Sequence, residues 1–369
     1  MPPLVAYSLA QVLFSVAAAH AGLDPLRAAS WCQGDSGHYL AIAVSGYELF
    51  PCPEPERAAE EQWCGNAGWL PGYPLVLRTL RACGARVRPA GLVVSALCGA
   101  GALGLLWTLF LGAELSPGNL GALTLAAFFP GAVYHHAVFP ISLFTALALL
   151  ALDALARGRR MAGALAGAAA AFTYSTGFLL SPVAALHLAT TSRVHGRGRR
   201  VGLALAALVA ICIALGSLAV LVLQRWSVGV WDAFFRVQAT YGHGIHNPAA
   251  TLLERLLAPF DPAASDGPRA PAAQTVFVLA WIAALATLLW RRRAALGDRE
   301  RLLALFTAAF WAVPLVVGSG VALHRAEALL LPSVALAPRL PRPLLAAFAL
   351  AALVLAWRMG LLFFQAALL

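Results

Sequence analysis

Residues 201–224 read Val-Gly-Leu-Ala-Leu-Ala-Ala-Leu-Val-Ala-Ile-Cys-Ile-Ala-Leu-Gly-Ser-Leu-Ala-Val-Leu-Val-Leu-Gln, a run without a charged side chain. About 20 apolar residues in a helix are enough to cross the hydrocarbon core of a bilayer. The chain has further apolar runs at 3–21, 90–112, 119–133, 137–155, 161–189, 273–290, 302–322, 326–337 and 343–364. The sequence therefore predicts an all-α, polytopic integral membrane protein.

The composition leaves little room for any other fold class. The chain is 61% hydrophobic and only 11% charged, and its mean hydropathy is +0.77. A soluble domain of this composition would have too few polar residues to cover its surface. We expect one transmembrane domain over residues 1–369, with no large soluble domain.

The number of spans depends on three of the runs. The polar stretch 173–177 and Pro182 divide the run 161–189, which we expect to form two half-length helices that meet near the outer face. The runs 119–133 and 326–337 are short for membrane spans. We therefore predict ten or eleven transmembrane helices.

The formal charge of +10 comes from arginine alone, because the chain has no lysine. The arginines cluster between apolar runs, as the positive-inside rule predicts for cytoplasmic loops, and this argues against a nucleic-acid-binding protein. With the N-terminus inside, the inside segments hold 14 arginines and four acids, and the outside segments hold 12 of each. The clusters are 157–160, 193–200, 291–293 and 339–342.

This topology leaves two long extracytoplasmic loops, 22–89 and 225–272. We expect two short interfacial helices in the first loop, near 36–46 and 72–84. Four arginines at 78–88 would lie outside against the charge rule, but that rule is weak for loops longer than about 60 residues. The first apolar run lacks the positive segment of a signal peptide, so we expect a retained helix.

The first outside loop contains the most distinctive motif. Residues 31–47 read Trp-Cys-Gln-Gly-Asp-Ser-Gly-His-Tyr-Leu-Ala-Ile-Ala-Val-Ser-Gly-Tyr, and an acidic insert and Trp-Leu-Pro-Gly-Tyr-Pro at 69–74 follow. This order resembles the first luminal loop of the PIG-V-like mannosyltransferases, GT-C membrane enzymes that take a sugar from a polyprenyl-phosphate carrier. The resemblance implies a GT-C-like fold and places His38 and Tyr39 among the substrate-binding residues. Gly34 stands where tryptophan is customary.

Asp35 is the candidate catalytic base. Inverting glycosyl transfer needs a base that takes the proton of the acceptor hydroxyl, and a group that stabilises the departing phosphate. Asp35 follows the first apolar run and should lie near the outer boundary of the bilayer. The alternative is that its side chain caps the helix that starts at Ser36.

Arg325 is the candidate for the phosphate contact. Residues 324–332 read His-Arg-Ala-Glu-Ala-Leu-Leu-Leu-Pro and resemble the Arg-(aromatic)-Leu-Leu-Pro element of GT-C enzymes, with Ala326 or Glu327 in place of the aromatic residue. The resemblance implies that Arg325, with His324, binds the donor phosphate, and the fork of donors on arginine suits phosphate. The alternative is an arginine that snorkels to the interface and pairs with Glu327.

The second outside loop carries a further match. Residues 232–248 resemble the Phe-x-x-x-Gln-x-x-Trp-Gly segment of the same family, which an Asn-Pro turn follows. The resemblance implies that Gln238, Tyr241 and His243 bind substrate. The alternative is an amphipathic interfacial helix that Phe234 and Tyr241 anchor.

His135 and His136 lie where the family departs from this chain. Relatives carry a Tyr-Ser-Glu step after a Phe-Pro pair, and that step is absent here. We expect the two histidines to bind substrate in its place, or this branch to use another sugar or acceptor. A zinc site with His243 and His246 is disfavoured because no Cys or acid stands at ligand spacing. We expect no metal and no cofactor.

Four of the six cysteines, Cys32, Cys52, Cys64 and Cys83, fall in the first outside loop, where oxidation is favoured. They allow three pairings, and we favour a disulfide between Cys52 and Cys64 that closes the acidic insert. Cys98 and Cys212 lie within apolar runs and are expected to be packing residues.

The predicted function is that of an inverting glycosyltransferase. It would move a sugar, mannose by the resemblance, from a polyprenyl-phosphate donor to a lipid- or glycan-linked acceptor. The absence of a glycine-rich nucleotide loop agrees with a lipid-linked donor. The expected location is the bacterial inner membrane with the site facing outside, or the endoplasmic reticulum membrane in a eukaryote. The alternatives are a non-catalytic GT-C-like partner subunit and a transporter or flippase of lipid-linked sugars.

Overall fold

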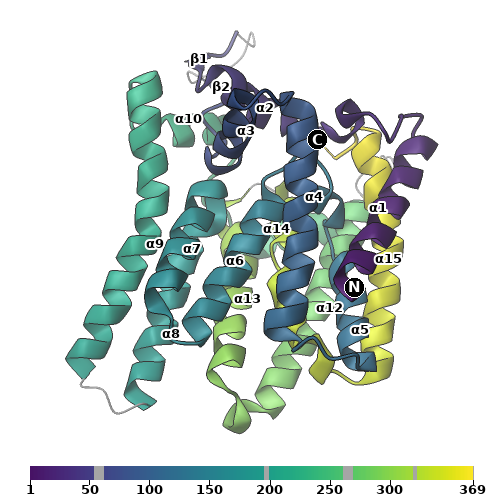
Figure 1. The fold of residues 1–369 in the computed structure, drawn as a ribbon, viewed down its shortest axis with the longest axis vertical. Helices are drawn as coiled ribbons and strands as arrows, with labels where there is room; N and C mark the ends of the chain where they lie inside the picture. The colour runs from purple at the N-terminus through teal and green to yellow at the C-terminus, as the bar shows by residue number, and fades with distance from the viewer. Residues whose placement is uncertain (54–61, 195–198, 261–268, 319–321, 369) are drawn as a thin grey trace.

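The computed structural model describes residues 1–53, 62–194, 199–260, 269–318 and 322–368. Figure 1 shows the helices packed side by side, most of them along the longest axis of the molecule. The predicted all-α membrane fold is confirmed, since the described residues include six helices that are long and apolar enough to cross a membrane. These are α1 (Pro2–His20), α4 (Val87–Leu105) with its π-helical extension η2 (Leu106–Phe110), α9 (Arg199–Val228), α12 (Arg269–Arg291), α13 (Asp298–Val317) and α15 (Arg342–Phe364).

The other predicted runs fall on shorter helices. The helix α6 has 16 residues, and most of its side chains are buried. A helix enclosed by other helices can be shorter than the bilayer, because protein rather than lipid surrounds it. The remaining short elements in the bundle are α5 (Pro117–Ala127), α6 (Ile141–Ala156), α7 (Arg160–Thr173), α8 (Leu180–Val194), α14 (Leu323–Ala328) and η8 (Leu331–Arg339).

The run 161–189 divides as the sequence predicted. The helices α7 and α8 are joined by the short 3-10 helix η4 (Ser175–Leu179). A methyl group added at Gly216 of α9 would overlap the carbonyl of Ala168 in α7, so the two backbones are in direct contact. Small residues allow transmembrane helices to approach this closely. This packing fixes the end of α7, where the chain turns at Tyr174.

The two ends of the bundle differ (Figure 1). One end, here called the outer end, holds the two segments that the sequence assigned to the outside, and the opposite inner end holds the turns after α6, α12 and η8. The arginine clusters 157–160, 291–293 and 339–342 fall in those inner turns. The outer elements are η1 (Ala28–Trp31), α2 (Ser36–Ser45), α3 (Gly72–Ala82), α10 (Ala233–Thr240), α11 (Pro248–Leu257) and η5 (Ala258–Phe260).

The expected interfacial helices at 36–46 and 72–84 correspond to α2 and α3. The sequence did not indicate the small antiparallel hairpin between them, formed by β1 (Leu49–Pro51) and β2 (Trp63–Gly65) with Phe50 opposite Cys64. Strands of three residues are too short to show an alternating pattern.

Ion pairs between buried carboxylates and partly exposed arginines connect the elements of the inner end. The carboxylate of Asp153 in α6 accepts hydrogen bonds from Arg157 Nε at 2.8 Å and from Arg299 Nη2 of α13 at 2.9 Å. Glu300 of α13 pairs with Arg339 of η8 at 2.6 Å, and its other oxygen accepts from the backbone N–H of Gly297 at 2.8 Å. These contacts connect three helical elements at one end of the bundle.

Candidate functional site

A polar pocket of about 80 Å³ lies at the outer end, where five segments distant in sequence meet. These segments are the start of α2, residues 68–70, the turn between α7 and η4, α10 with the residues after it, and α14 with the residue before it. Five of the residues that the sequence selected line this pocket. The full lining is Asp35, Tyr39, Gly68, Trp69, Leu70, Thr173, Tyr174, Ser175, Gln238, His243, Ala322 and Arg325.

Asp35 and Arg325 form an ion pair in this pocket. The Nη1 group of Arg325 donates to Oδ2 of Asp35, which lies 290 residues away in the sequence. The side chains are 26% and 18% exposed, so the pair is shielded from water but remains accessible from the pocket. Partial burial strengthens the attraction between the two charges relative to a surface pair.

The alternatives for these two residues do not match the contacts. Asp35 occupies the N-cap position of α2, yet its side chain makes no capping hydrogen bond. Glu327, the proposed partner of a snorkelling Arg325, instead accepts a hydrogen bond from Gln274 Nε2 of α12 at 2.6 Å. Asp35 and Arg325 therefore contact each other rather than the partners that the two alternatives require.

Trp69, which lines the pocket, packs against two further rings. The imidazole of His38 stacks on the indole of Trp69, with ring centroids 3.5 Å apart and planes 11° apart. Tyr241 meets the same indole edge-on at 5.5 Å. Burial lowers the pKa of His38, and the nearby Asp35 carboxylate opposes that shift only in part. The His38 imidazole is therefore uncharged near neutral pH.

The motif around Tyr39 and Pro71 brings α2 and α3 to the pocket. Tyr39 is buried and meets Tyr73 of α3 edge-on, with ring centroids 6.1 Å apart. Gly72 begins α3 at a point where any side chain would overlap Thr173 at the end of α7. Only glycine permits this approach, which sets the pocket wall of α7 against the first loop.

Gln238 and His243 line the pocket from α10 and the residues after it. Gln238 Nε2 of α10 donates to the carbonyl of Gly68 at 2.6 Å, and a methyl group at Gly68 would come within 2.9 Å of Val237. His243 follows α10 and lines the pocket. Burial, with a smaller contribution from the Arg325 charge, lowers the pKa of His243. Its imidazole is therefore neutral near pH 7.

A larger apolar cavity adjoins the polar pocket. It has a volume of about 570 Å³ and shares Tyr174, Ser175, Gln238, His243 and Ala322 with the polar pocket. Its other lining residues are mostly apolar, among them Phe178, Phe234, Phe235, Ile245, Pro314, Val317 and Leu323. A ligand with an apolar tail and a charged head could occupy the cavity and the pocket together.

Tyr174 is a site residue that the sequence reasoning missed. It lines both the polar pocket and the apolar cavity. A phenol hydroxyl is protonated near neutral pH and can donate a hydrogen bond. The signal available in the sequence was its place in the polar stretch that interrupts the run 161–189.

Four histidines that the sequence assigned to substrate or to the donor phosphate do not line the pocket, namely His38, His135, His136 and His324. His324 Nε2 contacts the hydroxyl of Tyr134 in the turn before α6 at 2.8 Å. His136 contacts Gln11 Oε1 of α1 at 2.8 Å and stacks on Tyr7 at 4.3 Å. His135 is buried beside it in η3 (Ala132–His135). The end of an apolar run fixes the depth of a residue but not the direction of its side chain.

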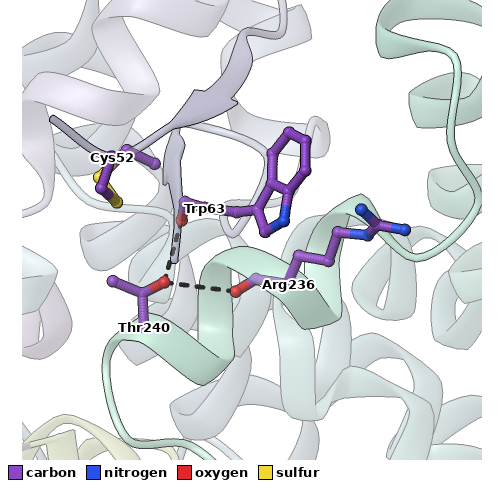
Figure 2. Close-up of a disulfide and its surroundings, with 5 residues drawn as sticks. Cys52, Trp63, Arg236 and Thr240 are labelled. Carbon is purple, nitrogen blue, oxygen red and sulfur yellow. Dashed lines mark hydrogen bonds between the residues drawn. A yellow bond between two sulfur atoms is a disulfide. The ribbon is translucent and has the colours of Figure 1, made fainter. Parts of the chain in front are cut away.

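The disulfide that the sequence favoured, between Cys52 and Cys64, is present and closes the hairpin (Figure 2). The adjacent Trp63 contacts α10 through the hydroxyl of Thr240, which donates to the Trp63 carbonyl at 3.0 Å. The guanidinium of Arg236 lies 5.0 Å from the Trp63 ring centroid. The hairpin thus holds α10, and with it Gln238, against the first loop.

In the described part of the chain, no group of three or more His, Cys, Asp or Glu side chains could hold a metal ion. The zinc alternative also needed His135 and His136 beside His243. The structure instead places His136 against α1 and His243 in the pocket.

Comparisons with known proteins support the fold. No protein-family model and no curated protein matches the chain. The fold is similar to the Archaeoglobus fulgidus oligosaccharyltransferase in its apo form, with a TM-score of 0.51, 13% identity, and coverage of 99% of this chain and 56% of that chain. It is also similar to the oligosaccharyltransferase AglB of that archaeon in complex with an inhibitory peptide and a dolichol-phosphate, with a TM-score of 0.51, 12% identity, and coverage of 97% and 56%. The chain spans about half the length of these structures, and it is an integral membrane protein with a GT-C-like fold.

Proposed function

We propose that this protein is an inverting glycosyltransferase that takes a sugar from a polyprenyl-phosphate carrier. The observation that carries the proposal is the Asp35–Arg325 ion pair, which lies where a polar pocket meets an apolar cavity. The motif resemblance makes mannose the proposed sugar and a lipid- or glycan-linked molecule the proposed acceptor. The site would face the outside of the bacterial inner membrane, or the lumen of the endoplasmic reticulum.

In the proposed reaction, an acceptor hydroxyl oxygen attacks the anomeric carbon of the donor sugar. The bond between that carbon and the phosphate oxygen breaks, and its electron pair leaves with the lipid phosphate. Asp35 takes the proton of the acceptor hydroxyl as general base. Arg325 stabilises the charge that develops on the phosphate. Attack from the face opposite the phosphate inverts the anomeric carbon.

The ion pair suits these two roles. Arginine presents five donors in a planar fork, so Arg325 can bind a phosphate while it still contacts Asp35. A phosphate that competes for the guanidinium would also weaken its hold on the carboxylate. Binding of the donor would therefore make the Asp35 carboxylate a stronger base toward the acceptor proton, although its contact with Arg325 remains.

The apolar cavity supports a lipid-linked donor. Its aromatic and aliphatic lining suits a polyprenyl chain, and its polar end meets the pocket at Tyr174 and His243. The hydroxyl of Tyr174 could donate to a phosphate oxygen, and the neutral imidazole of His243 could share that role. One of the similar solved structures is an oligosaccharyltransferase in complex with a dolichol-phosphate, which agrees with this proposal.

A donor panel tests the function. Purified protein in lipid vesicles would be incubated with radiolabelled polyprenyl-phosphate mannose, polyprenyl-phosphate glucose or a nucleotide-linked mannose, together with a membrane lipid extract as the source of acceptor. We expect label to leave a polyprenyl-phosphate donor for an acceptor, fastest with mannose, and to stay on the nucleotide. If no polyprenyl-phosphate sugar loses label, the enzymatic proposal fails and a non-catalytic partner subunit becomes the better account.

A further inference from the structure

Arg325 lies on α14, a helix too short to be stable without contacts to the rest of the protein. The helix α14 has six residues and no side-chain cap at its start. A helix of this length is not stable by itself, because a single turn forms too few hydrogen bonds to offset the ordering of its backbone. Contacts with the rest of the protein must therefore fix the place of Arg325.

One buried amide supplies two of these contacts and a third to the turn before η3. The side chain of Gln274 in α12 is fully buried. Its Nε2 donates to the carbonyl of His324 at 3.0 Å and to Glu327 Oε2 at 2.6 Å, and its Oε1 accepts from the backbone N–H of Gly131 at 3.1 Å. Gln274 thus joins α14 to α12 and to the turn before η3.

Glu327 lies on the side of α14 away from the pocket. Two residues along a helix are separated by about 200° around its axis. Arg325 contacts Asp35 on one side, and Glu327 contacts Gln274 on the other. Glu327 is only 3% exposed and does not line the polar pocket.

Burial of a carboxyl group such as that of Glu327 adds little to the stability of a fold. Moving such a group out of water costs several kcal/mol, and a packed apolar side chain of similar size often gives equal or better stability. Two oxygen atoms of α14 accept hydrogen bonds from Gln274, and these directional contacts fix the position and rotation of the helix. An apolar contact would allow the helix to slide.

We infer that Glu327 and Gln274 are positioning residues that hold the Arg325 guanidinium against Asp35. This inference rests on the proposed function for its meaning in catalysis, but its geometry can be tested without it. Glu327 does not touch substrate in this account, and it acts only through Arg325.

The first test measures, from rates of sugar transfer, whether substitutions at Glu327 and Arg325 depend on each other. We expect Glu327→Leu to lower the rate of sugar transfer on the order of tenfold or more, because small misplacements of a reacting group are costly. Glu327→Gln, which keeps an acceptor for Gln274, should stay near the parent rate. In an Arg325→Lys background, Glu327→Leu should add little, because the group that it positions is already changed.

Asn119→Leu is the matched control. Asn119 of α5 is a buried side chain near the inner end that donates to the carbonyls of Leu111 at 2.8 Å and Glu114 at 3.1 Å. Its loss should affect thermal stability, and its effect on transfer should be the same with and without Arg325→Lys. If the effects of Glu327→Leu and Arg325→Lys simply multiply, the positioning role is overturned.

The second test needs no substrate. Asp35→Cys and Arg325→Cys would be combined in a chain whose four free cysteines are replaced by alanine, and the rate of cross-linking by a short bifunctional thiol reagent would be measured. We expect Glu327→Leu or Gln274→Leu to slow cross-linking several-fold, and Asn119→Leu or Glu327→Gln to leave it unchanged. An unchanged rate in both leucine variants at α14 and α12 would overturn the inference. A failed donor panel with slowed cross-linking would instead overturn only the proposed function.

Discussion

The two ends of the bundle use the same pair of residue types in opposite ways. At the inner end, Asp153 accepts hydrogen bonds from two arginines, one of which also donates to the Leu109 carbonyl at 2.7 Å. At the outer end, Asp35 contacts Arg325 beside a pocket. Among the contacts of the described residues, Asp35 has no second arginine.

This difference distinguishes a structural ion pair from one that can bind a ligand. A carboxylate whose lone pairs are occupied by several donors cannot accept a proton from a substrate without breaking those contacts. A carboxylate with a single partner at a cavity can. The Asp35–Arg325 pair thus has the incomplete contacts and the access that chemistry requires, and the Asp153 cluster has neither.

Among the variants that test this comparison, removal of the Arg325 side chain should lower the rate of sugar transfer the most. We expect Arg325→Ala to lower sugar transfer on the order of 10²- to 10³-fold, because it removes the charge that we propose stabilises the leaving phosphate. Arg325→Lys keeps the charge and loses the fork, and it should fall between the alanine variant and the parent. Single-turnover rates in vesicles would measure both. Parent-like turnover of the alanine variant would remove Arg325 from the site.

A covalent cross-link, the Cys52–Cys64 disulfide, stabilises the outer end, whereas the contacts described at the inner end are ion pairs and hydrogen bonds. Replacement of Cys52 and Cys64 by serine should lower the free energy of unfolding by about 2–3 kcal/mol through loop closure. Thermal unfolding of parent and variant would measure this change. Mass spectrometry of non-reduced peptides should find the two cysteines in one linked peptide, and free thiols at both would contradict the pairing.

A change at the inner end should affect stability and spare turnover. In Asp153→Asn, two arginines lose their charged partner. Because those arginines are 43% and 36% exposed, water screens them, and we expect a loss of only about 1–2 kcal/mol. Thermal unfolding and turnover per folded molecule would be measured together. A large fall in turnover without loss of stability would break the comparison between the two ends.

Tyr174 should show the smallest of these effects. Tyr174→Phe removes one neutral hydrogen-bond donor worth about 1 kcal/mol, which corresponds to roughly a fivefold change. We expect the change in the apparent affinity for the polyprenyl-phosphate donor, with stability unchanged. Ser217→Ala, a hydroxyl in the transmembrane helix α9 that does not line the polar pocket, is the matched control. Equal effects of the two variants would remove Tyr174 from the phosphate site.

Much of the fold could be predicted because the bilayer is a demanding solvent. Apolar runs such as 201–224 have few alternatives to membrane helices, and the interrupted run 161–189 divided where its polar residues indicated. Length alone did not reveal that α6 is enclosed by its neighbours. The three-residue strands of the hairpin carried no periodic signal.

Motifs in the sequence named individual residues of the candidate site, but not their contacts. Asp35 and Arg325 were selected separately, and no spacing in the sequence showed that they touch. His135 and His136 were misplaced because a position at the end of a run does not say which way a side chain points. Tyr174 was missed because its role depends on a turn that brings it between two cavities.

The most direct test of the account compares two aspartates at the outer end. Asp232 pairs with Arg236 at 2.9 Å and does not line the polar pocket, so Asp232→Asn is a matched control for Asp35→Asn. Transfer of label from polyprenyl-phosphate mannose would be measured for both variants at equal amounts of folded protein. We predict that Asp35→Asn loses on the order of 10²-fold or more in rate, because asparagine cannot accept the acceptor proton, while Asp232→Asn keeps the parent rate. Equal rates in the two variants would contradict the assignment of Asp35 as the base.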